Sequence, residues 1–391
     1  MKENHSLPLG NECLMNKYTR EDSILLLNGL PKVGPVTIRK ILDATQGDPS
    51  SIFSLKRSEI LGIPGIGPAM ADSILDDKNA AWLQKEKIEI NKRGWKFLSD
   101  DEIPTLLHHI YDTPMGLYCH GEVPAGPFIS IVGTRQPSLY GQRICHEIAA
   151  GLAEMGFCIV SGMARGIDSI AHRAALDRKG KTLAFLGSGL DIIYPPENTS
   201  LFCDIIKNGA VLSEFPQGRK ADRKTFPMRN RLVSGISSAV VVIESARSGG
   251  SLITAQFAAD QGRVVFAVPG RVDQAESAGC NELIREGAIL VRNAHDIAEE
   301  IQANILPCLS FKAKSESTSK QEGQFPDFLM SDNLSKEEKG MLTVLKDGST
   351  LGIEELMEKS SLTFSQVSSA LSMLEINGLI MKRTDGRFEI K

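Results

Sequence analysis

Apolar and polar positions alternate with two different periods in the middle of the chain. Between residues 127 and 306, short β-branched runs are separated by amphipathic stretches of helical period. Strands that are apolar on both faces and are separated by helices predict a parallel sheet covered on both sides. We therefore predict a doubly wound α/β domain, assigned to residues 101–306. The predicted strands are 128–132, 157–161, 182–187, 210–214, 239–244 and 264–268, and predicted helices include 139–155, 167–176 and 251–261.

An internal repeat precedes this domain. Residues 27–42 and 60–75 share one rhythm, in which Gly34 and Gly67 are equivalent and each is followed by proline. Each copy predicts a helix, a tight hairpin and a second helix, because glycine permits the turn and proline can open the next helix. The pattern resembles the helix-hairpin-helix unit, whose hairpin amides can bind phosphate. Simple packing as a helical domain over 1–100 is at least as well supported, because several acids lie near the hairpins: Asp43, Asp72, Asp76 and Asp77.

The C-terminal part contains a polar linker and a further helical pattern. Residues 307–333 are too poor in apolar side chains to pack. Residues 334–391 predict three helices and a short hairpin, the order of a winged-helix module. Its predicted recognition helix, 363–378, contains no Lys or Arg, whereas DNA-reading helices usually carry cations. We therefore predict a packing or protein-contact role for this module, with three wing cations as candidate DNA contacts: Lys382, Arg383 and Arg387.

Composition narrows the class of protein. The apolar runs are far too short to cross a bilayer, and residues 1–12 lack the apolar core and cleavage site of a secretory signal. The seven cysteines are scattered and never spaced as C-x-x-C. These features predict a cytoplasmic protein with no membrane span, no disulfide framework and no zinc site. The dinucleotide fingerprint G-x-G-x-x-G is absent after the first predicted strand, so we predict no cofactor.

Charge indicates a local patch rather than a global attraction to phosphate. The formal net charge is −4, so any nucleic-acid site must be confined to part of the surface. Residues 219–231 provide such a patch, with a single acid, Asp222. A charge run is most often a solvated loop, but Phe226 and Pro227 interrupt this one and favour a shaped surface. Its cations are Arg219, Lys220, Arg223, Lys224, Arg229 and Arg231.

Glycine-rich turns follow four of the predicted strands. Ligands of doubly wound sheets bind beyond the carboxyl ends of the strands, where these turns lie. Glycine lets backbone amides approach a phosphate, hydroxyls add donors, and arginine adds charge and a planar fork. Five arginines are expected to converge there, which suits a phosphate-rich polymer: Arg135, Arg165, Arg229, Arg231 and Arg247. We predict that Asp168 caps the helix that follows the second turn or orients that turn, and that His172, four residues later on the same helix face, is a structural histidine.

Seven motifs follow one another in a fixed order between about residues 128 and 290. They are IVGTRQPSLYG, VSGMARGIDSIAH, FLGSGLDIIYPPEN, VLSEFPQG, FPMRNRLVSGIS, VVVIESARSGGSLITAQFA and VFAVPG. Together they resemble one family, the DNA-processing protein A (DprA, or Smf) family. The resemblance implies an extended Rossmann-like sheet flanked by an N-terminal helical domain and a C-terminal winged helix. It also implies binding of single-stranded DNA, a homodimer, and delivery of single strands to the RecA recombinase during natural transformation.

Carried over position by position, the resemblance implies a DNA pocket. Its cations would grip phosphates, its amides at helix N-termini would bind phosphate oxygens, and Phe226 would stack on a base, which is typically worth about 1–3 kcal/mol. One departure is Thr225, where many members carry His. The implied DNA-binding residues are Arg135, Ser161, Gly162, Arg165, Lys224, Phe226, Arg229, Asn230, Arg231, Gly249, Gly250 and Ser251.

A different class of protein is the alternative. The extended Rossmann-like fold also resembles nucleotide-cleaving phosphoribohydrolases of the lysine-decarboxylase-like type, with the motif P-G-G-x-G-T-x-x-E. The nearest stretch is 248–256, in which Gln256 occupies the place of the catalytic glutamate. An amide cannot replace that carboxylate, so we predict no enzymatic activity and keep a nucleotide-binding hydrolase as the alternative. A third possibility, an adaptor without DNA contact, leaves the basic patch unexplained.

Overall fold

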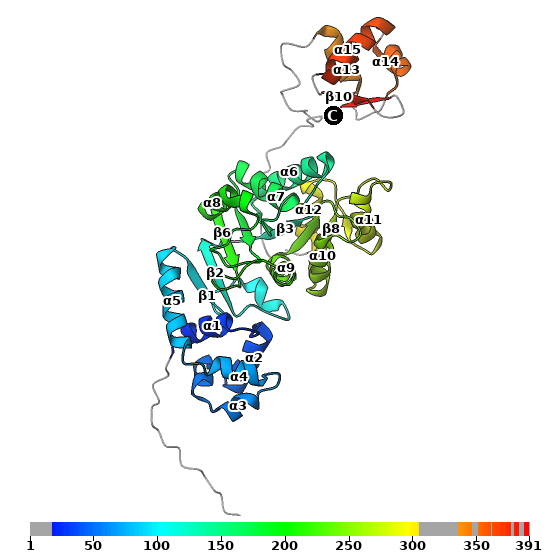
Figure 1. Cartoon of the computed structure of the whole chain (residues 1–391). Coiled ribbons are helices and arrows are strands. Elements are labelled where there is room, and N and C mark those ends of the chain that lie inside the picture. Colours follow the sequence, from blue (N-terminus) through cyan, green and yellow to red (C-terminus); the bar gives the residue numbers. More distant parts are fainter. Residues whose placement is uncertain are drawn as a thin grey trace, which may run out of the picture. The chain divides into compact units, whose positions relative to one another are not determined.

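The computed structural model describes residues 18–304, 335–345, 351–360, 362–376, 379–382 and 387–390. Contacts divide the chain into two compact units, residues 1–312 and 313–391, and each is described by itself (Figure 1). The predicted linker, 307–333, lies outside the described residues. Nowhere in the described ranges is a helix long and apolar enough to cross a bilayer.

A mixed sheet of nine strands forms the centre of the first unit, in the order β1-β2-β6-β5-β4-β3-β7-β8-β9 among the described residues. The run from β6 to β9 is parallel throughout. This run contains every predicted strand and consists of β3 (Phe128–Val132), β4 (Cys158–Ser161), β5 (Thr182–Phe185), β6 (Gly209–Ser213), β7 (Ala239–Val242), β8 (Val264–Ala267) and β9 (Ile289–Leu290).

The predicted parallel sheet is confirmed, and two strands that were not predicted extend it at one edge. There, β2 (Gly116–Gly121) pairs antiparallel with β6, and β1 (Lys96–Ser99) pairs antiparallel with β2. Antiparallel strands need no crossover helix, and only a short 3₁₀ helix, η2 (Thr105–His109), lies between these two. The first strand of the sheet, β1, ends at Ser99 and so lies before the predicted start of the α/β domain at residue 101. The boundary between the two domains stays a prediction.

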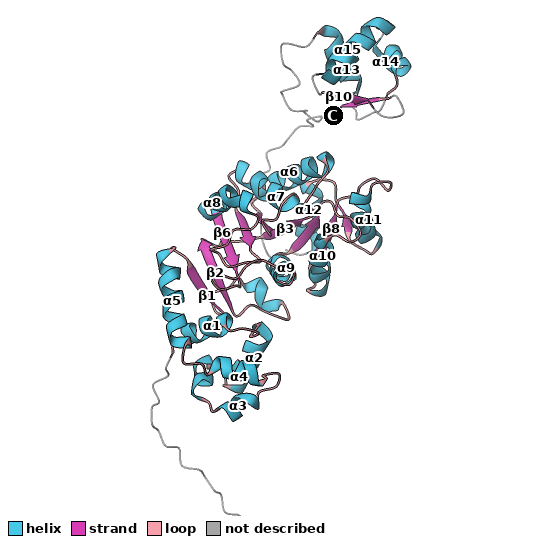
Figure 2. Cartoon of the chain, viewed as in Figure 1, coloured by secondary structure: helices cyan, strands magenta, loops and turns pink. Residues whose placement is uncertain are grey.

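Helices cover both faces of the sheet, as Figure 2 shows. Buried alanines of α6 and α7 belong to the same core cluster as the isoleucines of β3 and β4. Because alanine is small, these helices can pack closely against the sheet. One face carries α6 (Leu139–Glu154), α7 (Ile167–Asp177), α8 (Thr199–Asn208) and α12 (Ala294–Asn304). The opposite face carries α9 (Thr225–Ile236), α10 (Gly250–Asp260) and α11 (Ala278–Arg285). The short helices η3 (Pro196–Asn198) and η4 (Ala275–Ser277) lie in loops.

The repeat forms two helical hairpins, and the predicted proline at the start of each second helix is confirmed. The predicted role of Gly34 and Gly67 in the turn is wrong, because both are extended, with φ of −122° and −93°. The left-handed residues are Lys32 (φ 64°) and Gly65 (φ 89°), two positions earlier. The helices of this domain are α1 (Arg20–Gly29), α2 (Pro35–Ala44), η1 (Pro49–Ser54), α3 (Arg57–Leu61), α4 (Pro68–Ile74) and α5 (Asn79–Lys92).

The second unit is the predicted winged helix. Three helices surround a core that includes Leu345, Leu356 and Leu371, and a two-stranded hairpin follows. The wing cation Arg387 lies 3.8 Å from Glu355 through its Nη1 atom, whereas Arg383 lies outside the described residues. The elements are α13 (Lys336–Leu345), α14 (Ile353–Ser360), α15 (Phe364–Ile376), β10 (Ile380–Lys382) and β11 (Phe388–Ile390).

Candidate nucleic-acid interface

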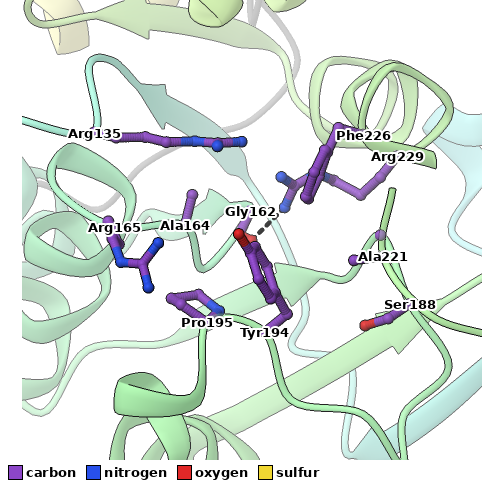
Figure 3. A pocket seen from close by; sticks show the side chains of 11 residues that line it. Arg135, Gly162, Ala164, Arg165, Ser188, Tyr194, Pro195, Ala221, Phe226 and Arg229 are labelled. Carbon is purple, nitrogen blue, oxygen red and sulfur yellow. Dashed lines mark hydrogen bonds between the residues drawn. The ribbon is translucent and has the colours of Figure 1, made fainter. Parts of the chain in front are cut away.

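A pocket opens where the loops after β3, β4 and β5 meet the first turns of α9 (Figure 3). This is the carboxyl end of adjacent parallel strands, where ligands of doubly wound sheets bind. Five of the predicted site residues therefore lie together: Arg135, Gly162, Arg165, Phe226 and Arg229. The pocket is lined by Arg135, Gly162, Ala164, Arg165, Gly187, Ser188, Tyr194, Pro195, Ala221, Phe226 and Arg229.

Two arginines and two aromatic rings are neighbours in the pocket. The guanidinium carbon of Arg135 lies 5.1 Å from the centroid of the Phe226 ring. The centroid of the Tyr194 ring lies 5.8 Å from the centroid of the Phe226 ring, with the two ring planes at 44°. The guanidinium of Arg165 lies 6.0 Å from the Tyr194 centroid. The site therefore offers both charge for phosphates and ring faces for bases.

Arg165 already has an acidic partner. Its Nε atom donates to the carboxylate of Glu197, and both side chains are about half exposed. This hydrogen bond raises the pKa of Arg165 and lowers the pKa of Glu197, so both groups are charged at neutral pH. A phosphate bound by Arg165 would compete with this carboxylate.

Arg229 forms the floor of the pocket. It reaches in from α9, is 5% exposed, and donates through Nη1 to the carbonyl oxygens of Gly162 and Phe185. Burial lowers the pKa of Arg229, and the nearby carboxylate of Asp168 opposes that shift. A Cβ atom on Gly162 would lie 1.8 Å from Nη1 of Arg229. Glycine at 162 therefore makes room for a guanidinium.

Asp168 orients the turn after β4, as predicted. Its Oδ2 atom accepts hydrogen bonds from the backbone nitrogens of Gly162 and Ala164, at 3.1 and 3.3 Å. Burial raises the pKa of this carboxyl, whereas the charge of Arg229 lowers it. Because Asp168 accepts from these amides, they are less suited to the predicted role of binding phosphate oxygens.

Arg231 points away from the pocket, so the predicted convergence of five arginines is wrong for this residue. Its side chain is 4% exposed and pairs with the carboxylate of Glu214, which is equally buried. Its Nε atom lies 3.1 Å from a carboxylate oxygen of Asp112. Burial raises the pKa of Glu214, and the charge of Arg231 opposes that shift. This geometry gives Arg231 a packing role.

Arg247 also lies elsewhere. It is exposed and is 3.9 Å from Glu282, in a second cleft between α10, α11, β8 and β9. Gln256 lines the same cleft and donates to Asp260 at 2.8 Å. The position that a hydrolase would fill with its catalytic glutamate is therefore not part of the arginine-lined pocket.

The remaining predicted residues do not line the pocket. Ser161 is buried and donates to the carbonyl of Ile131 at 2.6 Å. The side-chain oxygen of Asn230 accepts from Nε of Arg229 at 3.1 Å. Lys224 is exposed, just before α9. Gly249, Gly250 and Ser251 form the start of α10. There the hydroxyl of Ser251 donates to Ser245 at 2.8 Å.

The residue that departs from the family pattern, Thr225, is buried at the start of α9. Its hydroxyl accepts from the backbone nitrogen of Asp222 at 2.9 Å, and Asp222 in turn accepts from the nitrogens of Lys224 and Thr225. These backbone hydrogen bonds lower the pKa of Asp222. Thr225 thus orders the first turn of α9, which carries Phe226.

Sequence reasoning missed Tyr194. This residue lies in the loop after β5, at the same edge of the sheet as the predicted turns. An aromatic residue following the third glycine-rich turn was the available signal, but a single residue in a loop has no periodicity. Glu197, the partner of Arg165, was missed for the same reason.

Three family models match this chain. The model described as DNA recombination-mediator protein A matches residues 95–302. A SAM-like helix-hairpin-helix tandem matches residues 24–77, and the DprA winged helix domain matches residues 331–386. The three matches follow the order of the helical domain, the sheet and the winged helix.

Individual relatives agree with these matches. Protein Smf of Synechocystis is 33% identical over 351 residues, which cover 84% of this chain and 88% of that protein. The DNA processing protein DprA of Bacillus subtilis is 40% identical over 207 residues, covering 52% of this chain and 70% of that protein. The X-ray structure of DNA processing protein A from Streptococcus pneumoniae is 35% identical, with a TM-score of 0.63, and the alignment covers 73% of this chain and 98% of that one.

Proposed function

The chain belongs to the DNA-processing protein A (DprA/Smf) family, and from this premise we propose that it binds single-stranded DNA in the pocket at the carboxyl ends of β3, β4 and β5. Its relatives carry the name of DNA processing proteins, which makes DNA the first candidate ligand. The finer assignment, to single strands and to this pocket, is argued from the residues that line it.

One observation carries the proposal: the ring of Phe226 lies close both to the guanidinium of Arg135, at 5.1 Å, and to the ring of Tyr194, at 5.8 Å. Aromatic faces bind unpaired bases by stacking, and each stacked base is typically worth about 1–3 kcal/mol. In a duplex the base faces are already stacked and cannot reach such a ring. The arrangement therefore favours single strands over duplex.

Different residues serve different parts of the strand in this proposal. Arg135 and Arg165 bind phosphates, and Lys224 adds an exposed cation beside the pocket. Phe226 and Tyr194 contact bases. The pocket floor is held by Arg229, Asn230, Ser161 and Gly162. Arg231 holds α9 through its buried carboxylate partner Glu214.

Family membership supports a wider role. We propose that the protein acts in the cytoplasm as a homodimer, protects single strands, and loads the RecA recombinase on them during transformation or recombination. No catalytic step is needed for this role. The pocket does not support the hydrolase alternative, because Gln256, at the position of the catalytic glutamate, lies in the second cleft.

The test is fluorescence anisotropy of labelled oligo-dT and of duplex DNA across a salt series. Wild type is expected to prefer the single strand and to weaken as salt rises. Arg135→Ala should weaken binding by about tenfold or more and reduce the salt slope by about one phosphate contact. Arg178→Ala is the control. Arg178, at the end of α7, is also an exposed arginine paired with a glutamate, Glu154, but it does not line the pocket.

The outcomes separate the candidates. If wild type binds no strand at low salt, the proposal is wrong, and release of a free base from nucleoside monophosphates should be assayed. If Arg135→Ala and Arg178→Ala bind equally well, DNA binds somewhere other than this pocket.

A further inference from the structure

The β6–α9 loop, residues 214–224, connects the helical domain to the DNA pocket. It carries four cations of the basic patch: Arg219, Lys220, Arg223 and Lys224. Its residue Ala221 lines the pocket, and Phe226, which also lines it, is the second residue after the loop. The loop contains neither helix nor strand. The contacts that hold its backbone therefore decide where its side chains lie.

Helix α5 of the helical domain holds the loop through Gln217. Glu86 is 4% exposed, and its Oε1 atom accepts from the backbone nitrogen of Gln217 at 3.1 Å. Three residues further along, Glu89 accepts from the side-chain nitrogen of Gln217 at 3.3 Å. An ion pair of 3.1 Å with Arg93 fixes that second carboxylate. One face of α5 thus binds both donors of Gln217.

Two other elements hold the residues on either side. Asn28 of α1 donates through Nδ2 to the carbonyl oxygen of Glu214 at 2.8 Å. The backbone nitrogen of Gly218 donates to Asp191 at 3.0 Å, in the same loop after β5 that carries Tyr194. The beginning of the β6–α9 loop is therefore held between two helices of the helical domain and the rim of the pocket.

From these contacts we infer that the N-terminal helical domain, through Glu86 of α5, positions the β6–α9 loop for DNA binding. Glu86 is a positioning residue, because it does not line the pocket and acts through the backbone of Gln217. The inference rests on the proposed function of the pocket. It gives the helical domain a role that needs no DNA contact of its own.

The sign of the effect distinguishes positioning from simple charge. Removing an acid reduces the negative charge of the protein, and this alone would strengthen DNA binding slightly. Loss of positioning acts in the opposite direction. Without Glu86 the partly buried amide of Gln217 has lost its partner, and the loop must find another arrangement. We expect Glu86→Ala to weaken oligo-dT binding by about tenfold, from the cost of one unpaired buried amide.

The first experiment needs no DNA. Hydrogen–deuterium exchange is measured on the full-length protein, comparing peptides over 214–224 with peptides over α6. Exchange over 214–224 should rise in Glu86→Ala and stay near wild type in Glu86→Gln, because the amide oxygen still accepts the bond. Glu154→Ala is the matched control, since it makes the same charge change at an exposed acid on α6.

Oligo-dT binding by the same variants completes the test. Glu86→Ala should bind about tenfold more weakly, while Glu86→Gln and Glu154→Ala stay within about twofold of wild type. In a double-mutant cycle, Glu86→Ala should cost less in the presence of Lys224→Ala, because the cation to be positioned is gone. Should Glu86→Ala raise exchange throughout the helical domain, Asn28→Ala replaces it as the variant that releases the loop.

Two results would overturn the inference. One is unchanged exchange over 214–224 in Glu86→Ala. The other is increased exchange with oligo-dT affinity equal to wild type, which would mean that the order of the loop does not matter for binding. Failure of the proposed function looks different, because wild type itself would then bind no oligo-dT while the exchange of the loop still responds to Glu86.

Discussion

Gly162 is the residue on which the geometry of the pocket depends most directly. The guanidinium of Arg229 occupies the space that a Cβ at this position would need, at 1.8 Å from Nη1. Gly162→Ala must therefore displace Arg229 from the carbonyls of Gly162 and Phe185. We expect the free energy of unfolding to fall by about 1–3 kcal/mol. Oligo-dT affinity should fall by about tenfold, as urea unfolding and anisotropy would measure.

Gly250 provides the contrasting substitution. It was also predicted to contact DNA, yet nothing lies within 4 Å of a Cβ built there. Gly250→Ala should therefore leave affinity within about twofold of wild type. If Gly162→Ala also binds like wild type, the Arg229 floor does not matter for DNA binding, and the pocket assignment loses its main structural support.

Single residues show what the sequence can and cannot predict about the site. Glycine-rich turns after strands predicted the correct edge of the sheet, because parallel strands end together. The direction of each arginine was not predictable. Arg231 is buried because it forms ion pairs with Glu214 and Asp112. Asp112 is 119 residues away in the chain. Such partners become visible only when the fold brings them together.

At the scale of elements, a buried histidine joins α7 to β5. His172 is fully buried, and its Nδ1 atom lies 2.6 Å from the hydroxyl of Thr182, which donates to the carbonyl of Ile159 at 2.7 Å. The predicted structural role is confirmed. Burial is the main cause that lowers the pKa of His172 to about 3, and the nearby charge of Arg229 adds to the shift.

This pKa predicts a dependence of stability on pH. An unfolded histidine has a pKa of about 6.5, so between pH 6.5 and 3 the unfolded chain binds a proton that the folded chain does not. The free energy of unfolding therefore decreases as the pH is lowered through this window, by about 1.4 kcal/mol per pH unit for one such group. His172→Gln lacks this contribution. Its deficit in stability at pH 7 should shrink by about 2 kcal/mol at pH 5, as urea unfolding at both pH values would show.

A deficit that stays constant between pH 7 and pH 5 would mean that His172 takes up a proton in the folded protein. His146→Gln, at a histidine that is about half exposed, is the control for replacing a histidine with glutamine.

The periodicity of the sequence predicted the central elements well and the edge strands poorly. The predicted strands agree with β3 to β8 to within two residues at each end. Their runs are buried on both faces, so the apolar signal is strong. Of the missed strands, β9 has two residues and β1 has one buried residue, whereas β2 is six residues long and its first four residues are buried. They become strands through pairing with their neighbours, which a local pattern does not contain.

At the scale of the whole molecule, the division into two compact units makes a prediction about the winged helix. All residues of the pocket, and all those that hold the β6–α9 loop, lie within residues 1–312. Helix α15 of the second unit contains no Lys or Arg to bind phosphates. A fragment ending at residue 312 should therefore fold and bind oligo-dT within about twofold of the full chain.

Circular dichroism and anisotropy on the fragment would check this prediction, with the salt slope as the sharper measure. Each phosphate contact contributes a slope of about 0.7 for single strands. An unchanged slope would mean that the winged helix contributes no phosphate contact, which leaves a protein partner as the reason for its presence in the chain. A slope that falls by one or two contacts would instead assign DNA binding to the wing, where Lys382, Arg383 and Arg387 are the cations available.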